Sequence, residues 1–219
     1  MYSALVINNQ DPNKLGRVLI RLWWAPDAGG LVGIQKGQEY DAWARLATMA
    51  AGKDRGSWFL PEIGDEVLVS FEGGHPSRPV VLGSLWNGVD TPPVSADPQN
   101  TVKMLRTRGG SEVRFDDTSG EETVEICTAN GQSIRVGSGA GGVVEITDGN
   151  GNTVTMGSAG LSLISSATVT LSGSTITLDA GMVKVNAGMV KCSGVVQSDT
   201  LITNSVVASS YTPGAGNVW

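Results

Sequence analysis

The stretch TVTLSGSTITLDAGMVKVNAGMVKCSG, residues 168–194, repeats every seven residues. Each repeat contains a polar residue between two apolar residues, as in VTL at 169–171 and VKV at 183–185. Residues two apart lie on the same face of a β-strand, whereas coiled-coil heptads place apolar residues three and four apart. The many glycines and threonines also disfavour a helix. The repeat therefore predicts one short strand and one corner per seven residues.

The same triplet of apolar, polar and apolar residues continues upstream of this stretch. Ten triplets run from residues 113–115 to 190–192, and the middle residue is polar in every one. The spacing between successive triplets decreases from ten or eleven residues to seven or eight. Strands this short do not form a stable sheet alone. We therefore expect them to stack, about 4.8 Å apart, with their apolar face covered.

Two closed architectures would cover this face. In a single-chain β-solenoid, successive repeats form the faces of one coil; in an intertwined homotrimer, each chain contributes one face to every layer. A solenoid favours repeats of uniform length, whereas a trimer accepts a changing repeat because all three chains change together. The pattern thus favours a triple-stranded β-helix. The residues expected to form its trimer core are Val154, Met156, Leu161, Leu163, Val169, Leu171, Ile176, Leu178, Val183, Val185, Val190 and Cys192.

The first part of the chain has a different composition. Five of the six tryptophans precede residue 93, whereas Gly, Ser, Thr and Val dominate after it. Short β-branched runs punctuated by Gly or Pro lie at 15–24, 42–48, 64–74 and 78–86. Such runs are typical of a small closed barrel, and an OB-fold barrel has the size that fits.

These patterns predict an all-β chain with three parts. An OB-fold domain occupies residues 1–93, a Pro-rich linker occupies 94–103, and a trimeric β-helix needle with a C-terminal tip segment occupies 104–219.

Composition excludes several classes of protein. The 219-residue chain carries a formal net charge of −6 and no basic block, which disfavours nucleic-acid binding. A single histidine, His75, excludes a multi-histidine metal site within one chain. Cys127 and Cys192 lie far apart without a CxxC context, so a disulfide-built fold is not expected. No apolar run approaches the length of a membrane span, and no Sec signal is visible.

Several stretches suggest a site, but a structural role explains each of them better. GSGAGG at 137–142 leads into a strand instead of a helix, so it does not form a phosphate loop. DGNGN at 148–152 lacks the acidic residue that closes a calcium loop. Asp65 and Glu66 point to opposite faces of a strand, and His75 lies at a Pro-rich turn without a nucleophile pattern. We therefore predict no catalytic, cofactor-binding or metal site and no enzymatic activity.

Three stretches carry a resemblance to a known family: GRVLIRLWW at 16–24, the long segment at 43–88, and TRGGSEVRFDD at 107–117. In order and spacing they resemble the OB-fold domain of contractile-phage baseplate spikes and VgrG-type spike proteins. The resemblance implies a homotrimer in which three OB barrels surround an axis and a triple-stranded β-helix forms a membrane-piercing needle. It also implies a trimeric hub protein at the OB-fold end and a PAAR-type protein at the C-terminal tip.

The chain differs from longer members of that family in two ways. VgrG-type proteins carry a hub domain ahead of the OB fold, so here we expect the hub to be a separate protein. Some phage spikes insert a lysozyme domain between barrel and needle, where this chain has only its linker. We therefore expect a structural spike that is assembled in the cytoplasm and then becomes part of a phage virion or an injection particle.

The last ten residues, SYTPGAGNVW at 210–219, break the repeat. The end of a needle exposes unpaired strand edges and an open core, and aromatic side chains suit an interface. The segment either folds over as a cap or forms a platform for the tip protein, and the resemblance favours the platform. The residues expected at this interface are Tyr211, Pro213, Asn217, Val218 and Trp219.

Two other functions remain alternatives to the spike. The OB barrel could be a binding module for nucleic acid or glycan, in which Trp23 and Trp24 would stack on bases. The trimer could instead be a tail-fibre adhesin whose tip binds a receptor.

Overall fold

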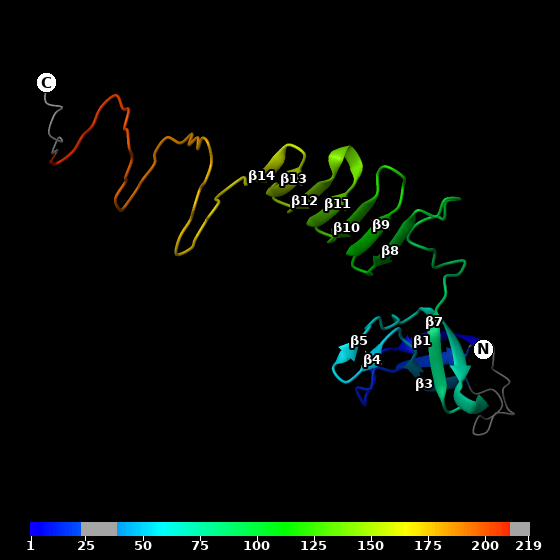
Figure 1. Cartoon of the computed structure of the whole chain (residues 1–219). Coiled ribbons are helices and arrows are strands. Elements are labelled where there is room, and N and C mark those ends of the chain that lie inside the picture. The colour runs from blue at the N-terminus through cyan, green and yellow to red at the C-terminus, as the bar shows by residue number, and fades with distance from the viewer. Residues whose placement is uncertain (23–38, 211–219) are drawn as a thin grey trace. The chain divides into compact units, whose positions relative to one another are not determined.

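The computed structural model describes residues 1–22 and 39–210 of the chain (Figure 1). The chain divides into two units, Met1–Ser166 and Ala167–Trp219. In the described residues, the regular elements are strands and two short 3-10 helices, η1 (Glu72–Gly74) and η2 (Gly139–Gly141). This composition confirms the all-β prediction.

The first five long strands close into a barrel, as the sequence predicts. Their order around the barrel is β1-β2-β3-β7-β6. Neighbouring strands are antiparallel except for β3 and β7, which are parallel and close the ring. The barrel strands are β1 (Tyr2–Asn8), β2 (Val18–Leu22), β3 (Tyr40–Leu46), β6 (Glu66–Phe71) and β7 (Pro79–Ser84). A small hairpin, β4 (Ala51–Gly52) and β5 (Arg55–Gly56), lies between β3 and β6 in the chain.

Alternation along each strand places small and β-branched side chains inside the barrel. In β2, for example, Val18, Ile20 and Leu22 are buried and the two residues between them are half-buried. Tyr40 lies at the edge of this core, where its hydroxyl donates to the carbonyl of Pro76, and burial raises its pKa to about 12. The buried core consists of Ala4, Val6, Val18, Ile20, Leu22, Tyr40, Ala44, Val67, Val69 and Val81.

The barrel core sets the stability of the first unit. Replacement of Ile20, which is fully buried, by Ala should lower the free energy of unfolding by about 2–5 kcal/mol, because it removes apolar contact and leaves a cavity. Ile63→Ala is the matched control: Ile63 is mostly exposed, so its loss should cost about 0.5 kcal/mol or less. Urea unfolding measures both values, and equal losses would contradict the assigned core.

Seven further strands form one antiparallel sheet in which each strand pairs with the next along the chain. Figure 1 shows them as a ladder of successive hairpins in green and yellow-green. The strands are β8 (Val102–Arg106), β9 (Glu112–Asp116), β10 (Thr123–Cys127), β11 (Ser133–Gly137), β12 (Val143–Thr147), β13 (Thr153–Gly157) and β14 (Gly160–Ile164). Six of the ten predicted triplets lie in β9 to β14, one in each strand.

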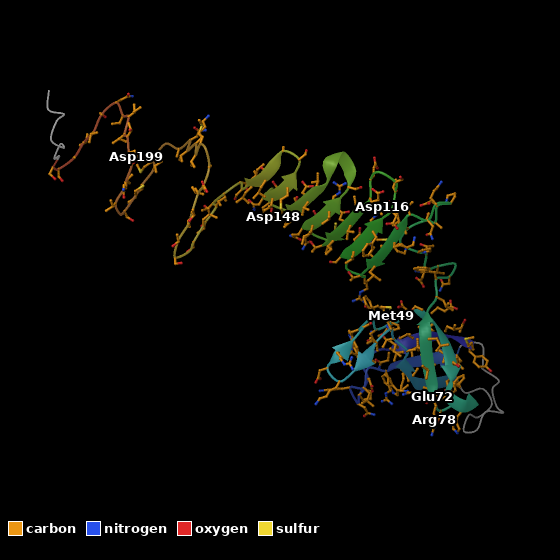
Figure 2. All side chains as sticks on the ribbon, viewed as in Figure 1. Met49, Glu72, Arg78, Asp116, Asp148 and Asp199 are labelled. Carbon is orange, nitrogen blue, oxygen red and sulfur yellow. The ribbon has the colours of Figure 1, made fainter. Side chains whose placement is uncertain are left out.

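Tight polar turns hold consecutive strands of this sheet in register. In the turn between β12 and β13, the Asp148 carboxylate accepts hydrogen bonds from the backbone N–H groups of Asn150 and Asn152, 2.8 and 2.9 Å away (Figure 2). The hydrogen bond from the Asn152 side-chain amide and these two backbone hydrogen bonds lower the pKa of Asp148 to about 2. Gly151 follows with φ of 84°, a left-handed conformation that glycine adopts without strain. DGNGN is therefore a turn, as predicted.

After β14 in the chain, residues 167–210 form successive arms joined by bends (Figure 1). They include the last four triplets, at 169–171, 176–178, 183–185 and 190–192, and none of these forms a strand in the single chain. No backbone–backbone hydrogen bond joins two residues within 169–210, because no arm has another arm of its own chain alongside it. Among the described residues, the last four triplets therefore have no strand partner in the same chain.

Candidate functional site

The sheet of β8 to β14 presents two continuous apolar rows on one side, which we call the apolar face. The register pairs each triplet with the next, so that Val124 lies opposite Val136 and Ile126 lies opposite Ile134. The same alignment holds from β9 to β14. The apolar face consists of Val113, Phe115, Val124, Ile126, Ile134, Val136, Val144, Ile146, Val154, Met156, Leu161 and Leu163.

No part of residues 1–22 and 39–210 covers the apolar face. Ile134 in the middle of the sheet is 43% exposed and Ile146 on the next strand is 42% exposed. Side chains of this kind at the centre of a sheet are normally buried, because each contributes about 1.5–3 kcal/mol when it leaves water completely. Four residues predicted for the trimer core, Val154, Met156, Leu161 and Leu163, lie on this face.

The other side of the sheet carries the middle residue of each triplet. Directly opposed residues there alternate in charge, since Glu125 lies between Arg114 and Arg135, and Glu145 follows Arg135. Opposite charges on facing strands stabilise one register, whereas like charges would destabilise it. The two sides of the sheet thus differ as the triplet pattern predicts, with one apolar and one polar.

The arms of the second unit expose apolar side chains to a greater degree. Leu171 is 68% exposed and Leu178 is 70% exposed. The predicted core residues in this unit that are exposed in the single chain are Val169, Leu171, Ile176, Leu178, Val183, Val185, Val190 and Cys192. Their assignment to a trimer core stays a prediction.

Two sets of predicted residues lie outside the described part of the chain. These are the tip residues Tyr211, Pro213, Asn217, Val218 and Trp219, and the tryptophans Trp23 and Trp24 of the alternative binding module.

The barrel carries an apolar surface that the sequence analysis did not single out. Around the β4–β5 hairpin, Met49 is 93% exposed and Trp58 is 71% exposed, and Phe59 beside them is also exposed (Figure 2). A groove of about 570 Å³ lies along this hairpin, with Leu15 and Arg45 in its lining. The run SWFLP at 57–61 breaks the alternating pattern of the barrel strands. This break is the sequence feature that could have predicted the apolar surface.

A partly buried ion pair organises the loop between β1 and β2. The Asp11 side chain is 3% exposed and accepts hydrogen bonds from the backbone N–H groups of Asn13 and Leu15 at 3.0 and 2.9 Å. The Arg17 guanidinium donates to both carboxylate oxygens, at 3.0 and 2.8 Å, and lies 5.6 Å from the centroid of the Trp43 ring. Its hydrogen bonds to Asp11 hold the pKa of that carboxyl well below its usual range.

The Asp11 pair makes the stability of the barrel depend on pH. Because folding lowers the pKa of Asp11, its contribution is complete above about pH 4 and is lost as the pH falls through the folded value. Asp11→Asn should lower the melting temperature by several degrees at pH 7, and the difference from the natural protein should shrink below pH 4. Thermal unfolding followed by circular dichroism at several pH values measures both effects.

The Arg21–Asp41 pair provides the matched control for that experiment. Arg21 donates to both oxygens of Asp41 at 2.8 and 2.7 Å, but both side chains are about one-third exposed. Exposed pairs contribute little, so Asp41→Asn should leave the melting temperature nearly unchanged. A loss as large as that of Asp11→Asn would show that burial of the pair does not matter.

Asp65 and Glu66, considered above as a possible site, and the nearby Glu62 have structural partners. Asp65 accepts from the backbone N–H of Glu62 at 2.9 Å, and Glu66 accepts from the Asn87 amide at 3.1 Å. Glu62 forms an ion pair with Arg108 at 3.1 Å. Asp65 and Glu66 both line a hollow of about 460 Å³, but each carboxylate has a local structural partner.

His75 has one neighbour that the sequence analysis missed. The Ser77 hydroxyl lies 2.7 Å from His75 Nδ1, within an exposed turn. A turn hydrogen bond between residues two apart explains this contact.

GSGAGG at 137–142 forms η2 and then enters β12, so no helix follows it. In residues 1–22 and 39–210, no group of three His, Cys, Asp or Glu side chains could hold a metal ion, and no helix could span a membrane.

Comparison with known proteins agrees with the barrel and its predicted resemblance. Residues 2–86 match the family described as the type VI secretion system/phage-baseplate injector OB domain. This segment is therefore similar to the injector OB domain. Just over half of the chain is similar to VgrG-type spike proteins, which confirms the resemblance predicted from the sequence.

Three relatives illustrate the extent of the similarity. The type VI secretion system spike protein VgrG1b of Pseudomonas aeruginosa is 31% identical over 57% of this chain and 17% of its own length. VgrG3 of Vibrio cholerae is 29% identical over 51% of this chain and 11% of its own length. The actin cross-linking toxin VgrG1 of Vibrio cholerae is 31% identical over 51% of this chain and 10% of its own length. The chain thus matches less than a fifth of each of these proteins.

Proposed function

We propose that the chain is one of three identical subunits of the central spike of a contractile injection system or phage baseplate. The observation that carries this proposal is the uncovered apolar face of β9 to β14, continued by the exposed apolar residues of the heptad arms. The injector OB domain at residues 2–86 supports the same function independently.

Three copies satisfy two demands that one chain leaves open. The apolar side chains need a partner surface, and the backbone groups of residues 169–210 need hydrogen-bond partners. Three arms that wind around a common axis enclose the apolar residues and leave no lateral strand edge. Two copies could cover one sheet with another, but they would leave the edges of the narrow heptad arms open.

The mechanism of such a spike is mechanical, and it requires no catalytic residue. A shaft in which every backbone group is paired and the core is dry and closely packed resists bending and compression. It would transmit the force of sheath contraction to the envelope of a target cell. We propose assembly in the cytoplasm, followed by incorporation into the particle.

The trimer can be tested with purified protein. Native mass spectrometry should give a particle of three chain masses. Ile146→Lys should abolish the trimer, because three charged groups would enter the covered core, whereas a monomer would tolerate a lysine at a site that is 42% exposed. Retention of the trimer by this variant would contradict burial of the apolar face.

Thr155→Lys is the matched control for this substitution. Thr155 lies on the polar side of β13, directly opposite Glu145, so a lysine there gains an opposite charge and should leave the trimer intact. A monomer in the natural protein itself would refute the proposed spike.

We further propose that the spike binds a trimeric hub through its OB barrels and carries a PAAR-type protein at the tip. The apolar surface around Met49, Trp58 and Phe59 supports the first contact, because a side chain as exposed as Met49 contributes nothing to the barrel core. The predicted tip residues Tyr211, Pro213, Asn217, Val218 and Trp219 would form the second.

The hub contact predicts a selective loss of binding. Met49→Asp should weaken capture of the hub protein of the same particle at least tenfold, with no change in the melting temperature. Lys53→Ser, an exposed change on the same hairpin, is the control and should bind normally. Titration of immobilised hub with each trimer measures the affinities. Normal binding by Met49→Asp would assign the contact to another surface.

A further inference from the structure

We infer that the sheet of β8 to β14 sets the axial alignment of the three chains, and that the heptad segment, residues 168–195, does not set it. This inference rests on the proposed trimer. It concerns how the three chains choose one alignment from several that the heptads would accept.

The two parts of the needle differ in where their backbone hydrogen bonds are made. Each strand from β8 to β14 pairs with its neighbour in the same chain. Beyond the sheet, within 169–210, no backbone–backbone hydrogen bond joins two described residues. The sheet can therefore form in one chain, whereas the arms obtain their backbone partners from other copies.

The heptads are nearly equivalent to one another. TVTL at 168–171 corresponds to TITL at 175–178, and MVKV at 182–185 corresponds to MVKC at 189–192. If one chain slid by seven residues against the others, apolar residues would still face apolar residues and polar residues would remain outside. A slip by one residue is excluded because it would turn every side chain to the other face. A slip by seven costs only the pairing of one layer at the end.

The sheet does not allow the same displacement. Its strands alternate in direction, so one copy recovers an equivalent arrangement against its partners only after a shift of two strands. That shift would uncover the apolar pairs of two strands at each end of the apolar face. A slip of seven residues in the heptads leaves only one layer unpaired, which is half as many. The row of alternating charges from Arg114 to Glu145 also fixes the strands of each copy as one block, so a single strand cannot adjust alone.

The axial alignment of the three sheets then determines the alignment of the arms. Once three apolar faces have packed together, the three chains leave β14 at Ile164 on one level. Tethering at this level gives the arms a high effective concentration and a common starting point. The arms then pair from residue 168 towards the C-terminus, and the first layer formed determines each later layer.

Trimers of mixed length test this inference. One chain keeps the natural length, and a second, shorter chain lacks exactly one heptad, residues 175–181. Both carry Cys127→Ser, so that Cys192 is the only cysteine. Co-expression with two different affinity tags isolates the mixed trimers, and copper-catalysed air oxidation then joins thiols that lie on the same level.

Alignment by the sheet places Cys192 of the shorter chain level with residue 185 of the longer chain. No disulfide should therefore join Cys192 of the two lengths. A longer chain that carries Val185→Cys and Cys192→Ser should form the disulfide with Cys192 of the shorter chain. Homotrimers of the natural length, in which all three Cys192 residues share one level, are the positive control.

Each other outcome decides the question. Disulfides between Cys192 of the two lengths would overturn the inference, because the arms would then have aligned themselves from the tip. Trimers that contain chains of only one length would also overturn it, because the heptads would then select their partners. A monomeric natural chain would refute the proposed trimer itself, and native mass spectrometry distinguishes that failure from the other two.

Discussion

The structure of this chain depends on one constraint: a strand only five residues long buries its apolar side only if another surface covers it. The barrel meets this demand within the chain, since β3 and β7 pair in parallel and close the ring around the core. In the sheet of β8 to β14 the backbone groups of neighbouring strands are paired, but the apolar face is not covered. In the arms, residues 169–210 have neither backbone–backbone hydrogen bonds with one another nor a cover over their apolar side chains in the described part of one chain.

The barrel, the sheet and the arms thus differ in how completely one copy folds them, and each has a different role in the proposed spike. The barrel is complete in one copy, so its surface is free to bind another protein, and Met49 and Trp58 lie on that surface. The sheet is folded but uncovered, which suits it to bring copies together. In the proposed trimer, the arms would acquire their backbone partners from the other copies.

Much of this organisation was predictable because strands have a simple period. Alternation correctly predicted the barrel strands and the two sides of the sheet, and the residue types of DGNGN predicted the turn at Asp148, since each depends on neighbours in the sequence. The Asp11–Arg17 pair and the Ser77–His75 contact were missed. Their partners are set by loop geometry, which leaves no periodic signal. The apolar surface at Trp58 was also missed, although SWFLP departs from the alternating pattern.

The sequence by itself determined which side chains share a face and that seven residues make one strand and one corner, because both follow from the local geometry of an extended backbone. Only the tertiary structure decided which strands pair. It closed the barrel through β3 and β7, and it continued pairing within the chain through β14 but no further. The same apolar and polar alternation precedes and follows Ile164, so the period could not locate that change. The spacing could not locate it either, because β13 and β14 pair although their triplets are seven residues apart, as in the heptads. Pairing needs two backbone segments side by side, and only the tertiary structure brings them together.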